Sequence, residues 1–529
     1  MSIFNCRYIS SQVYFKSNSL MPQKISRFII LLAVIFSGLP FLVGLLLQDA
    51  HYIYSGFLLN PIDGFSYLAK MQIGLRGEWL FHLPYTSQEG AGAFLFLFYI
   101  FLGHIARIFS LQPTLVFHLA RIAAVFFLCF GIEMFLRTIQ VRWLQSVFSY
   151  LLFVILFGTG FGWLAGPLGV FTMDFWVAEA YPFLSMIANP HFPFGVGLLL
   201  MFFSGIQENR SVKWFDPFLG VILAIVLPFG VVVGSAVIVV YNFFRWFQSE
   251  KIQWKLPLFY LLPAGIVLVY QYFAILSDPL LREWNAQNQT PTPSLWVLLL
   301  SFAPLLLFAL IGIGLWVVQD RDKNLNLVAA WLISGVGLAY FPFALQRRFL
   351  LGWFIPVGIF ALVGLGRITK NRISRFRKWF WLILPLSLLT NLFLLFGALQ
   401  AYTQHRSPLY LSRDEFAVLE WMNREVCPRK VVILTPADFG LLVPAYTNCR
   451  VVYGHPFETV YANMTQDWLE QFYDGEISQG EFSRFVESYQ IEYLVWPRGI
   501  LSKFSKWMEK LPVVYQNDRF IILETRQGS

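Results

Sequence analysis

Long apolar runs dominate this sequence between residues 27 and 403. A helix crosses a bilayer with about 17–25 mostly apolar residues. Of the 529 residues, 57% are hydrophobic and 13% are charged, whereas about a quarter of a soluble domain is charged. The chain is therefore predicted to be a polytopic α-helical membrane protein. Apolar segments of spanning length lie near residues 27–47, 92–110, 115–136, 145–165, 191–207, 215–246, 256–276, 294–318, 325–345, 349–366 and 379–400.

Positive charges in the short loops predict how the chain is oriented. Cytoplasmic loops are enriched in Lys and Arg, and the net charge of +9 is spread over such loops. Topology therefore explains the charge, and we predict no nucleic-acid partner. Residues 1–26 are expected to form a cytoplasmic tail before an uncleaved first span. The basic residues assigned to the outer side are Lys70, Arg76, Arg282, Arg347 and Arg348.

Two segments need special treatment in this topology. The run 215–246 is too long for one span, and Pro228 interrupts it, so we expect a tight pair of helices there. The segment 92–110 is expected to be a juxtamembrane or re-entrant helix. The result is about eleven crossings with the C-terminus outside the cytoplasm. Twelve plain crossings, which would place the C-terminus inside, are the alternative.

The region 404–529 differs in composition, because its apolar runs are short and charged residues are common. Strands predicted at 430–435, 450–453 and 492–496 alternate with helical stretches, and a final strand pair surrounds Asn517-Asp518. This order predicts a small extracytoplasmic α/β domain with a partly parallel sheet. Cys427 and Cys449 could form a disulfide there.

The polar stretch Asn60–Gly90 follows the first span and is the best candidate for an active site. We expect it to belong to a catalytic outer loop over residues 48–91. Asp63 is the candidate base, and Phe65, Tyr67, Leu68 and Met71 have the spacing of a short helix that would fix it. A turn aspartate is the alternative interpretation.

Further polar residues could bind a metal or a substrate. Glu78, His82 and Glu89 could join Asp63 around a divalent ion, but no tight ligand spacing is present, and solvated loop charges are the preferred explanation. A second outer loop over residues 166–190 is acidic, and it could orient a sugar hydroxyl or hold a cation. Its candidate residues are Asp174 and Glu179, with His191 opening the next span.

Two adjacent arginines, Arg347 and Arg348, interrupt apolar sequence on the predicted outer side. Arginine presents a planar fork of donors to phosphate oxygens, so a lipid phosphate is a suitable partner. Snorkelling to lipid headgroups is the alternative.

The order of these features resembles the GT-C superfamily of membrane glycosyltransferases, more narrowly the bacterial family-39-like enzymes of the protein mannosyltransferase and aminoarabinose transferase type. The matching residues are Asp63 with Tyr67 to Met71, including Lys70; Gly77-Glu78-Trp79; Phe117 to Arg121; Gln346-Arg347-Arg348; and Gly454 to Thr459.

The resemblance implies a polyprenyl-phosphate-linked sugar as donor, with Asp63 as base and Arg347 or Arg348 on the donor phosphate. Many relatives carry a second acidic residue after the first, where this chain has Gly64. This departure leaves the requirement for a divalent metal open, and no other cofactor is implied.

We therefore predict a glycosyltransferase in a bacterial inner membrane, with membrane lipid around it and an acceptor glycan, lipid or protein. Single displacement with inversion fits one carboxylate facing one cation. The alternatives are a lipid or solute transporter, a polysaccharide polymerase or ligase, and a non-catalytic membrane scaffold.

Overall fold

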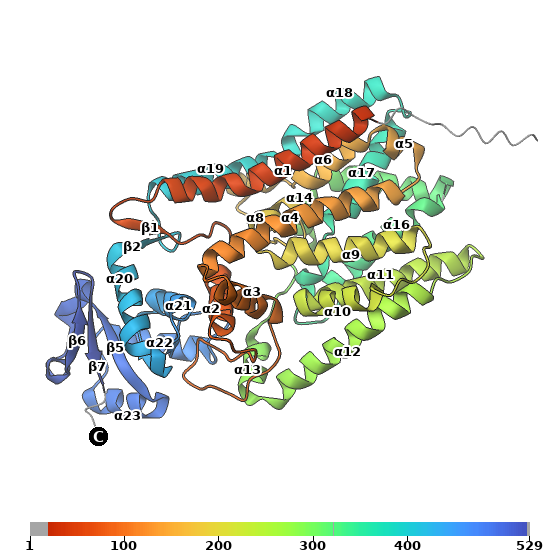
Figure 1. Ribbon diagram of the computed structural model, residues 1–529. Helices are drawn as coiled ribbons and strands as arrows, with labels where there is room; N and C mark the ends of the chain where they lie inside the picture. The colour runs from red at the N-terminus through yellow and green to blue at the C-terminus, as the bar shows by residue number, and fades with distance from the viewer. Residues whose placement is uncertain (1–19, 321, 526–529) are drawn as a thin grey trace, which may run out of the picture.

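The computed structural model describes residues 20–320 and 322–525. The predicted tail up to residue 19 lies outside this range. Figure 1 shows long helices packed side by side in one bundle, with a small domain of strands and helices at one end. The chain is thus a mostly helical membrane protein with a C-terminal α/β domain, as predicted.

Four helices in the described part of the chain are long and apolar enough to cross a membrane. They are α1 (Leu20–Leu46), α4 (Pro113–Thr138), α11 (Pro228–Phe247) and α12 (Lys255–Ser277). Two bent pairs raise this number to six if each pair is one span: Phe148–Phe157 with Gly162–Leu168, bent by 44°, and Leu295–Phe302 with Leu305–Gln319, bent by 97°. Eleven crossings therefore remain a prediction.

The other helices of the bundle are shorter. Those rich in apolar residues are α3 (Leu97–Ile108), α9 (His191–Gln207), α10 (Asp216–Val226), α17 (Phe354–Ile368) and α19 (Leu389–Thr403). The remainder are α2 (Pro61–Leu75), α5 (Arg142–Ser146), α6 (Phe148–Phe157), α7 (Ala165–Leu168), α8 (Pro182–Ile187), α13 (Pro279–Gln287), α14 (Leu295–Phe302), α15 (Leu305–Leu315), α16 (Asn326–Ala339) and α18 (Ile373–Ile383).

Of the two segments that needed special treatment, 215–246 forms the expected pair of helices, and the juxtamembrane or re-entrant position of 92–110 stays a prediction. The run 215–246 forms the separate helices α10 and α11, which meet at Leu227 and Pro228. The segment 92–110 contains only the 12-residue helix α3, which packs against α2 near the C-terminal domain. A Cβ on Gly74 would lie 1.9 Å from the Ile100 carbonyl oxygen. The glycine thus allows the two backbones to touch.

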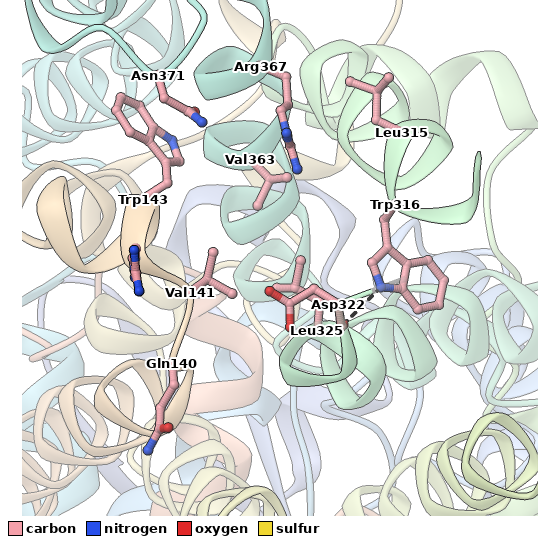
Figure 2. Close-up of a pocket in the computed structure, with 11 residues that line it drawn as sticks. Gln140, Val141, Trp143, Leu315, Trp316, Asp322, Leu325, Val363, Arg367 and Asn371 are labelled. Carbon is pink, nitrogen blue, oxygen red and sulfur yellow. Dashed lines mark hydrogen bonds between the residues drawn. The ribbon is translucent and has the colours of Figure 1, made fainter. Parts of the chain in front are cut away.

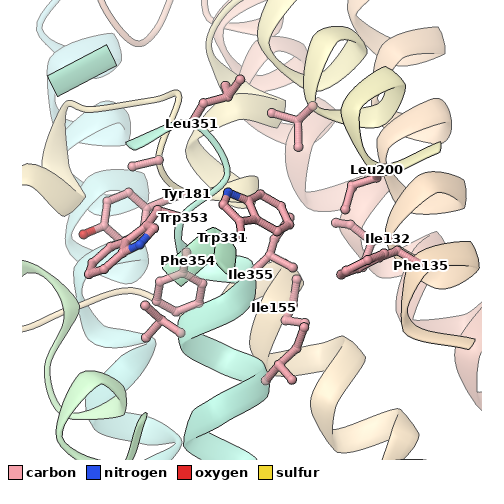
Figure 3. Packing of buried hydrophobic residues seen from close by; sticks show 14 of the residues in the cluster. Ile132, Phe135, Ile155, Tyr181, Leu200, Trp331, Leu351, Trp353, Phe354 and Ile355 are labelled. Atoms are coloured by element: carbon pink, nitrogen blue, oxygen red, sulfur yellow. The ribbon is translucent and has the colours of Figure 1, made fainter. Parts of the chain in front are cut away.

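Aromatic side chains fill the centre of the bundle (Figure 3). Trp331 of α16 meets Phe135 of α4 and Phe203 of α9 edge-on, with ring centroids 6.1 and 5.1 Å away. Trp353 is buried as well, and its indole N–H donates to the Leu332 carbonyl. Such pairs stabilise a bundle in lipid through close packing.

The two ends of the bundle differ. The helices α5 and α18 lie at the end where α1 begins, whereas α2 and the C-terminal domain lie at the opposite end (Figure 1). The segments that we assigned to the cytoplasm and the proposed catalytic segment are therefore separated by the length of the bundle. Which end faces the cytoplasm remains a prediction.

The C-terminal domain has a five-stranded mixed sheet in the order β4-β3-β5-β7-β6. Strand β3 pairs in parallel with β4 and β5, and β7 pairs antiparallel with β5 and β6. The predicted partly parallel sheet is thus confirmed. Its strands are β3 (Val432–Leu434), β4 (Arg450–Val451), β5 (Ile491–Pro497), β6 (Val513–Gln516) and β7 (Phe520–Glu524). Its α-helices are α20 (Arg413–Trp421), α21 (Ala437–Tyr446), α22 (Ala462–Tyr473) and α23 (Gln479–Tyr489).

Several contacts fasten this domain to the bundle. Strand β1 (Tyr52–Tyr54), which follows α1, pairs antiparallel with β2 (Tyr410–Ser412). One hydrophobic cluster joins Phe65 and Phe117 of the bundle to Leu441 and Val443 of α21. Cys427 and Cys449 form a disulfide in the domain. The domain and the adjacent end of the bundle therefore share one core.

Candidate functional site

Helix α2 positions Asp63, the candidate base. Asn60 adopts the left-handed conformation at φ 49°, and Pro61 begins the helix, so Asp63 lies in the first turn. The partial positive charge at a helix N-terminus favours a carboxylate there. The loop expected over residues 48–91 is thus helical from Pro61 to Leu75, because Phe65, Leu68 and Met71 bury one apolar face.

Gly64, the position where many relatives have a second acidic residue, cannot hold one in this packing. A Cβ on Gly64 would lie 2.3 Å from the ring of Phe57. Phe57 is itself buried between Phe65 and Phe117. The packing of Phe57 beneath Asp63 therefore requires a glycine at position 64.

A histidine from the C-terminal domain faces Asp63. The His455 Nε2 atom lies 3.9 Å from Asp63 Oδ1, and the two side chains are 2% and 42% exposed. Burial lowers the pKa of His455 below its ordinary value, although the charges of Glu458 and Asp63 oppose this. The resemblance described above includes the segment Gly454–Thr459. The sequence does not place this segment beside Asp63, since 392 positions separate His455 from Asp63.

Lys70 is buried in an ion pair with the same segment. Its Nζ lies 2.6 Å from Glu458 Oε1 and donates to Ser66 Oγ, which donates to Glu458 in turn. The ring of Phe96 covers the ammonium at 4.3 Å. Burial raises the pKa of Glu458, but Lys70 and His455 outweigh it and the net direction is downward. Lys70 thus anchors the domain, which corrects its assignment to substrate.

Tyr67, Tyr99 and His191 form an aromatic wall beside Asp63. The rings of Tyr67 and Tyr99 stack with centroids 4.1 Å apart, and the Tyr99 hydroxyl lies 2.6 Å from His191 Nδ1. The pKa of Tyr67 is raised, first by burial and then by the charge of Asp63. His191 is therefore held inside the protein by a tyrosine.

Arg347 and Arg348 lie on the short 3-10 helix Gln346–Leu350. The guanidinium of Arg347 stacks over Trp176 at 4.4 Å, and that of Arg348 lies 5.8 Å from the ring of Phe229. Neither guanidinium hydrogen-bonds or ion-pairs with any residue in the described ranges. Burial lowers the pKa of Arg347, and the charges of Glu179 and Asp63 oppose this. Arg347 and Asp63 are thus close enough to interact electrostatically.

A chain of backbone contacts links the arginines to the His455 segment. The amide of Arg347 donates to the Thr290 carbonyl, and the Asn288 side chain donates to the Phe457 carbonyl. The neighbouring Gln287 donates to the Thr459 carbonyl at 2.5 Å. The connection after α13 therefore joins both sides of the site.

The two acids of the second outer loop differ in their surroundings. Asp174 is buried, and its Oδ2 accepts from the backbone N–H groups of Gly160 and Gly162. It holds a loop, which corrects its assignment to substrate. Glu179 is also buried, but its Oε1 has no partner in the described protein. Because the Glu179 carbonyl accepts from the Gly352 amide, this acid lies beside the arginine segment.

Glu78, His82 and Glu89 gather away from Asp63, around a separate cavity of about 40 Å³ next to the disulfide. Glu78 pairs with Lys430 at 2.7 Å and with Arg76 at 3.6 Å, which corrects its assignment to substrate. Within the described ranges, no three His, Cys, Asp or Glu side chains could together hold a metal ion. The predicted set with Asp63 therefore does not fit a divalent metal.

A larger cavity of about 380 Å³ lies at the other end of the bundle (Figure 2). It is lined by Trp143 of α5, by Trp316, and by Arg367 of α17. Asp322 accepts from the Trp316 indole there through its carbonyl. This cavity is remote from Asp63.

Solved structures share this fold. The chain aligns with the Archaeoglobus fulgidus oligosaccharyltransferase in its apo form at a TM-score of 0.56 and 11% identity, covering 90% of this chain and 70% of that one. The chain also aligns with the archaeal oligosaccharyltransferase AglB from Archaeoglobus fulgidus in complex with an inhibitory peptide and a dolichol-phosphate. The TM-score is 0.52 and the identity 12%, and the alignment covers 90% of this chain and 70% of that one. For ArnT from Cupriavidus metallidurans bound to undecaprenyl phosphate, the TM-score is 0.48 and the identity 13%, and the alignment covers 93% of this chain and 97% of that one.

Comparisons of sequence alone find no match. No protein-family model matches the chain, and no curated protein matches it. At these low identities the likeness concerns the fold. The chain is an integral membrane protein that shares its fold with the archaeal oligosaccharyltransferase.

Proposed function

We propose that this protein transfers a sugar from a polyprenyl-phosphate donor to an acceptor hydroxyl at the outer face of a bacterial inner membrane. The observation that supports the proposal is that Asp63 lies within electrostatic range of Arg347, which is adjacent to Arg348. One is a half-exposed carboxylate at a helix start, and the others are cations without a protein partner in the described chain.

The arginines would hold the donor phosphate. Arginine forms paired charge-assisted hydrogen bonds with phosphate oxygens. Trp176 and Phe229 support the two guanidiniums by stacking and leave their N–H groups available. As the bond from the sugar to phosphate breaks, negative charge grows on the leaving phosphate, and fixed arginines stabilise it. Similarity to AglB and ArnT, which were solved with polyprenyl-type phosphates, supports this choice of donor.

Asp63 would take the proton of the acceptor. An acceptor hydroxyl attacks the anomeric carbon and loses its proton, and a carboxylate within hydrogen-bond distance can accept it. Attack from the face opposite the phosphate inverts the anomeric carbon in one displacement. Glu179, buried beside the arginines with an unpaired oxygen, is placed to orient a sugar hydroxyl.

The proposal is tested with purified protein in lipid nanodiscs and radiolabelled undecaprenyl-phosphate-linked mannose, glucose, galactose and arabinofuranose. Loss of label from the lipid is followed with and without added cell-envelope fraction. We expect one donor to be consumed by the wild type and not by Asp63→Asn. Equal consumption by both proteins, or no consumption of any donor, would contradict the proposal.

A further inference from the structure

The segment Gly454–Thr459 is the part of the C-terminal domain that reaches the proposed active site. Glu458 fixes it to α2 through the buried Lys70, and Gln287 and Asn288 fix it from the side of α13. Both ends of the segment are thus tied to the bundle. Its remaining titratable side chain, His455, is 2% exposed and faces Asp63.

Hydrogen bonds define which nitrogen of His455 carries the proton. The Nδ1 atom lies 3.1 Å from the backbone nitrogens of both Phe457 and Glu458 and accepts from them. An accepting nitrogen has no hydrogen, so the neutral ring carries its hydrogen on Nε2. Nε2 is buried and has no hydrogen-bond partner among the described residues.

Within the described ranges, the carboxylate of Asp63 lies at ion-pair distance from this unpaired donor. The distance of 3.9 Å between Nε2 and Asp63 Oδ1 is about 1 Å too long for a hydrogen bond. Buried donors are rarely left unpaired, and catalytic hydrogen bonds are often long before substrate binds. A small rotation of the half-exposed Asp63 side chain would close the gap.

We propose that His455 is a positioning residue, whose Nε2–H donates to Asp63 Oδ1 when substrate binds and turns Oδ2 toward the acceptor hydroxyl. The inference rests on the proposed function, because it assigns Asp63 the role of base. It gives the C-terminal domain a direct part in the reaction. His455 would not itself touch the sugar or the acceptor.

Two substitutions separate this role from a structural one. In His455→Asn the amide oxygen replaces Nδ1 and can still accept from Phe457 and Glu458, but nothing replaces Nε2. In His455→Gln the amide nitrogen reaches the place of Nε2 and can donate to Asp63. A structural role therefore predicts that Asn is the better substitute, and a positioning role predicts that Gln is.

The assay uses the undecaprenyl-phosphate sugar that the wild type consumes in the panel above. We expect kcat to fall about 10- to 100-fold in His455→Asn and to stay within a few-fold in His455→Gln, with the melting temperature of the Asn variant unchanged. Wild-type turnover in His455→Asn, or a greater loss in Gln than in Asn, would overturn the inference.

The pH profile gives a second readout. A hydrogen bond to a carboxylate favours its charged form. Because the proposed bond forms with substrate bound, its loss should move the acidic limb of kcat, which reports the enzyme–substrate complex, to higher pH. An unmoved limb would contradict the inference. The other charged or titratable groups that interact with this pair are Tyr67, Tyr99 and Arg347, which interact with Asp63, and Lys70 and Glu458, which interact with His455.

A double substitution covers the case in which the single variants lose stability. If His455 acts through Asp63, then His455→Asn should change the residual rate of Asp63→Asn by less than two-fold. If His455→Asn instead lowers the rate of the Asp63→Asn protein by the same factor as it lowers the wild-type rate, His455 has a separate structural role. If Asp63→Asn abolishes transfer while His455→Asn does not, the inference fails and the proposed function survives. If Asp63→Asn stays active, the proposed function fails as well.

Discussion

Lys70 and Glu458 are 388 positions apart in the chain, and their side chains meet at 2.6 Å inside the protein. Lys70 is fully buried, and Glu458 is 11% exposed at its side chain. A buried charge must be paired, because its desolvation is costly. This contact therefore decides how the C-terminal domain sits on α2, and through α2 how Asp63 meets His455.

Removing one partner of this pair should destabilise the docked domain. We expect Lys70→Met to lower the free energy of unfolding by about 3–5 kcal/mol, because Glu458 is left as an uncompensated buried charge. The double variant Lys70→Met/Glu458→Leu should recover most of the loss. Thermal unfolding in detergent measures both. Equal stability of the single variant and the wild type would show that the ion pair is dispensable.

Acid should weaken the same junction. The pKa values of His455 and Glu458 both lie below their ordinary values of 6.5 and 4.5 in the folded protein. The unfolded chain therefore binds more protons at low pH, and stability falls as pH decreases. The melting temperature should drop first below about pH 6.5 through His455 and again below about pH 4.5 through Glu458. In His455→Asn the upper of these two steps should be absent.

Asp63→Asn should abolish transfer without unfolding the protein. The side chain is 42% exposed, and its one ion-pair contact with the described part of the chain is with His455 at 3.9 Å, so its loss costs little packing. A general base contributes about 10²–10⁴-fold to a rate. We expect a fall of this size in turnover of the accepted donor, with an unchanged melting temperature. Asp63→Glu should retain part of the activity.

Arg347→Ala and Arg348→Ala should each weaken binding of undecaprenyl phosphate. A hydrogen bond to a charged group contributes about 1.5–3 kcal/mol, which corresponds to a roughly 10- to 100-fold change in Kd. Arg282→Ala is the matched control, since this exposed arginine of α13 carries the same charge. Titration of undecaprenyl phosphate into nanodiscs, followed by native mass spectrometry, gives the affinities. An equal loss in the control would indicate a non-specific charge effect.

Reduction of the Cys427–Cys449 bond should destabilise the C-terminal domain. A disulfide that closes a loop of 22 residues stabilises a fold by about 3 kcal/mol. Cys427→Ser/Cys449→Ser should therefore unfold at lower temperature than the wild type under oxidising conditions. Cys129→Ser, which removes the buried free thiol, serves as the comparison. Under reducing conditions the wild type and the double variant should behave alike.

Much of the fold was predictable because it depends on local patterns. The apolar runs predicted the bundle, Pro228 predicted the break between α10 and α11, and short apolar runs predicted the strands β3, β5 and β7. The helical spacing of Phe65, Leu68 and Met71 predicted the core of α2. Each signal lies within about twenty residues, where periodicity and chain-breaking residues are readable.

The candidate site was only partly predictable from those patterns. Asp63, Arg347 and Arg348 stood out because charge is unusual beside membrane spans. Lys70, Glu78 and Asp174 stood out for the same reason, yet they pair with Glu458, with Lys430 and with backbone amides. A sequence shows that a charge is present, but it does not show which partner neutralises it.

By itself, the sequence determined the membrane class, the mixed sheet of the C-terminal domain, and the presence of a carboxylate and an arginine pair at the ends of apolar segments. Only the tertiary structure decided that His455 faces Asp63, that Phe57 leaves no room for a side chain at Gly64, and that Lys70 is buried against Glu458. The physical reason is that two of these contacts join residues hundreds of positions apart, and the third depends on how Phe57 is held between Phe65 and Phe117. Packing and desolvation act on distance in space rather than in sequence.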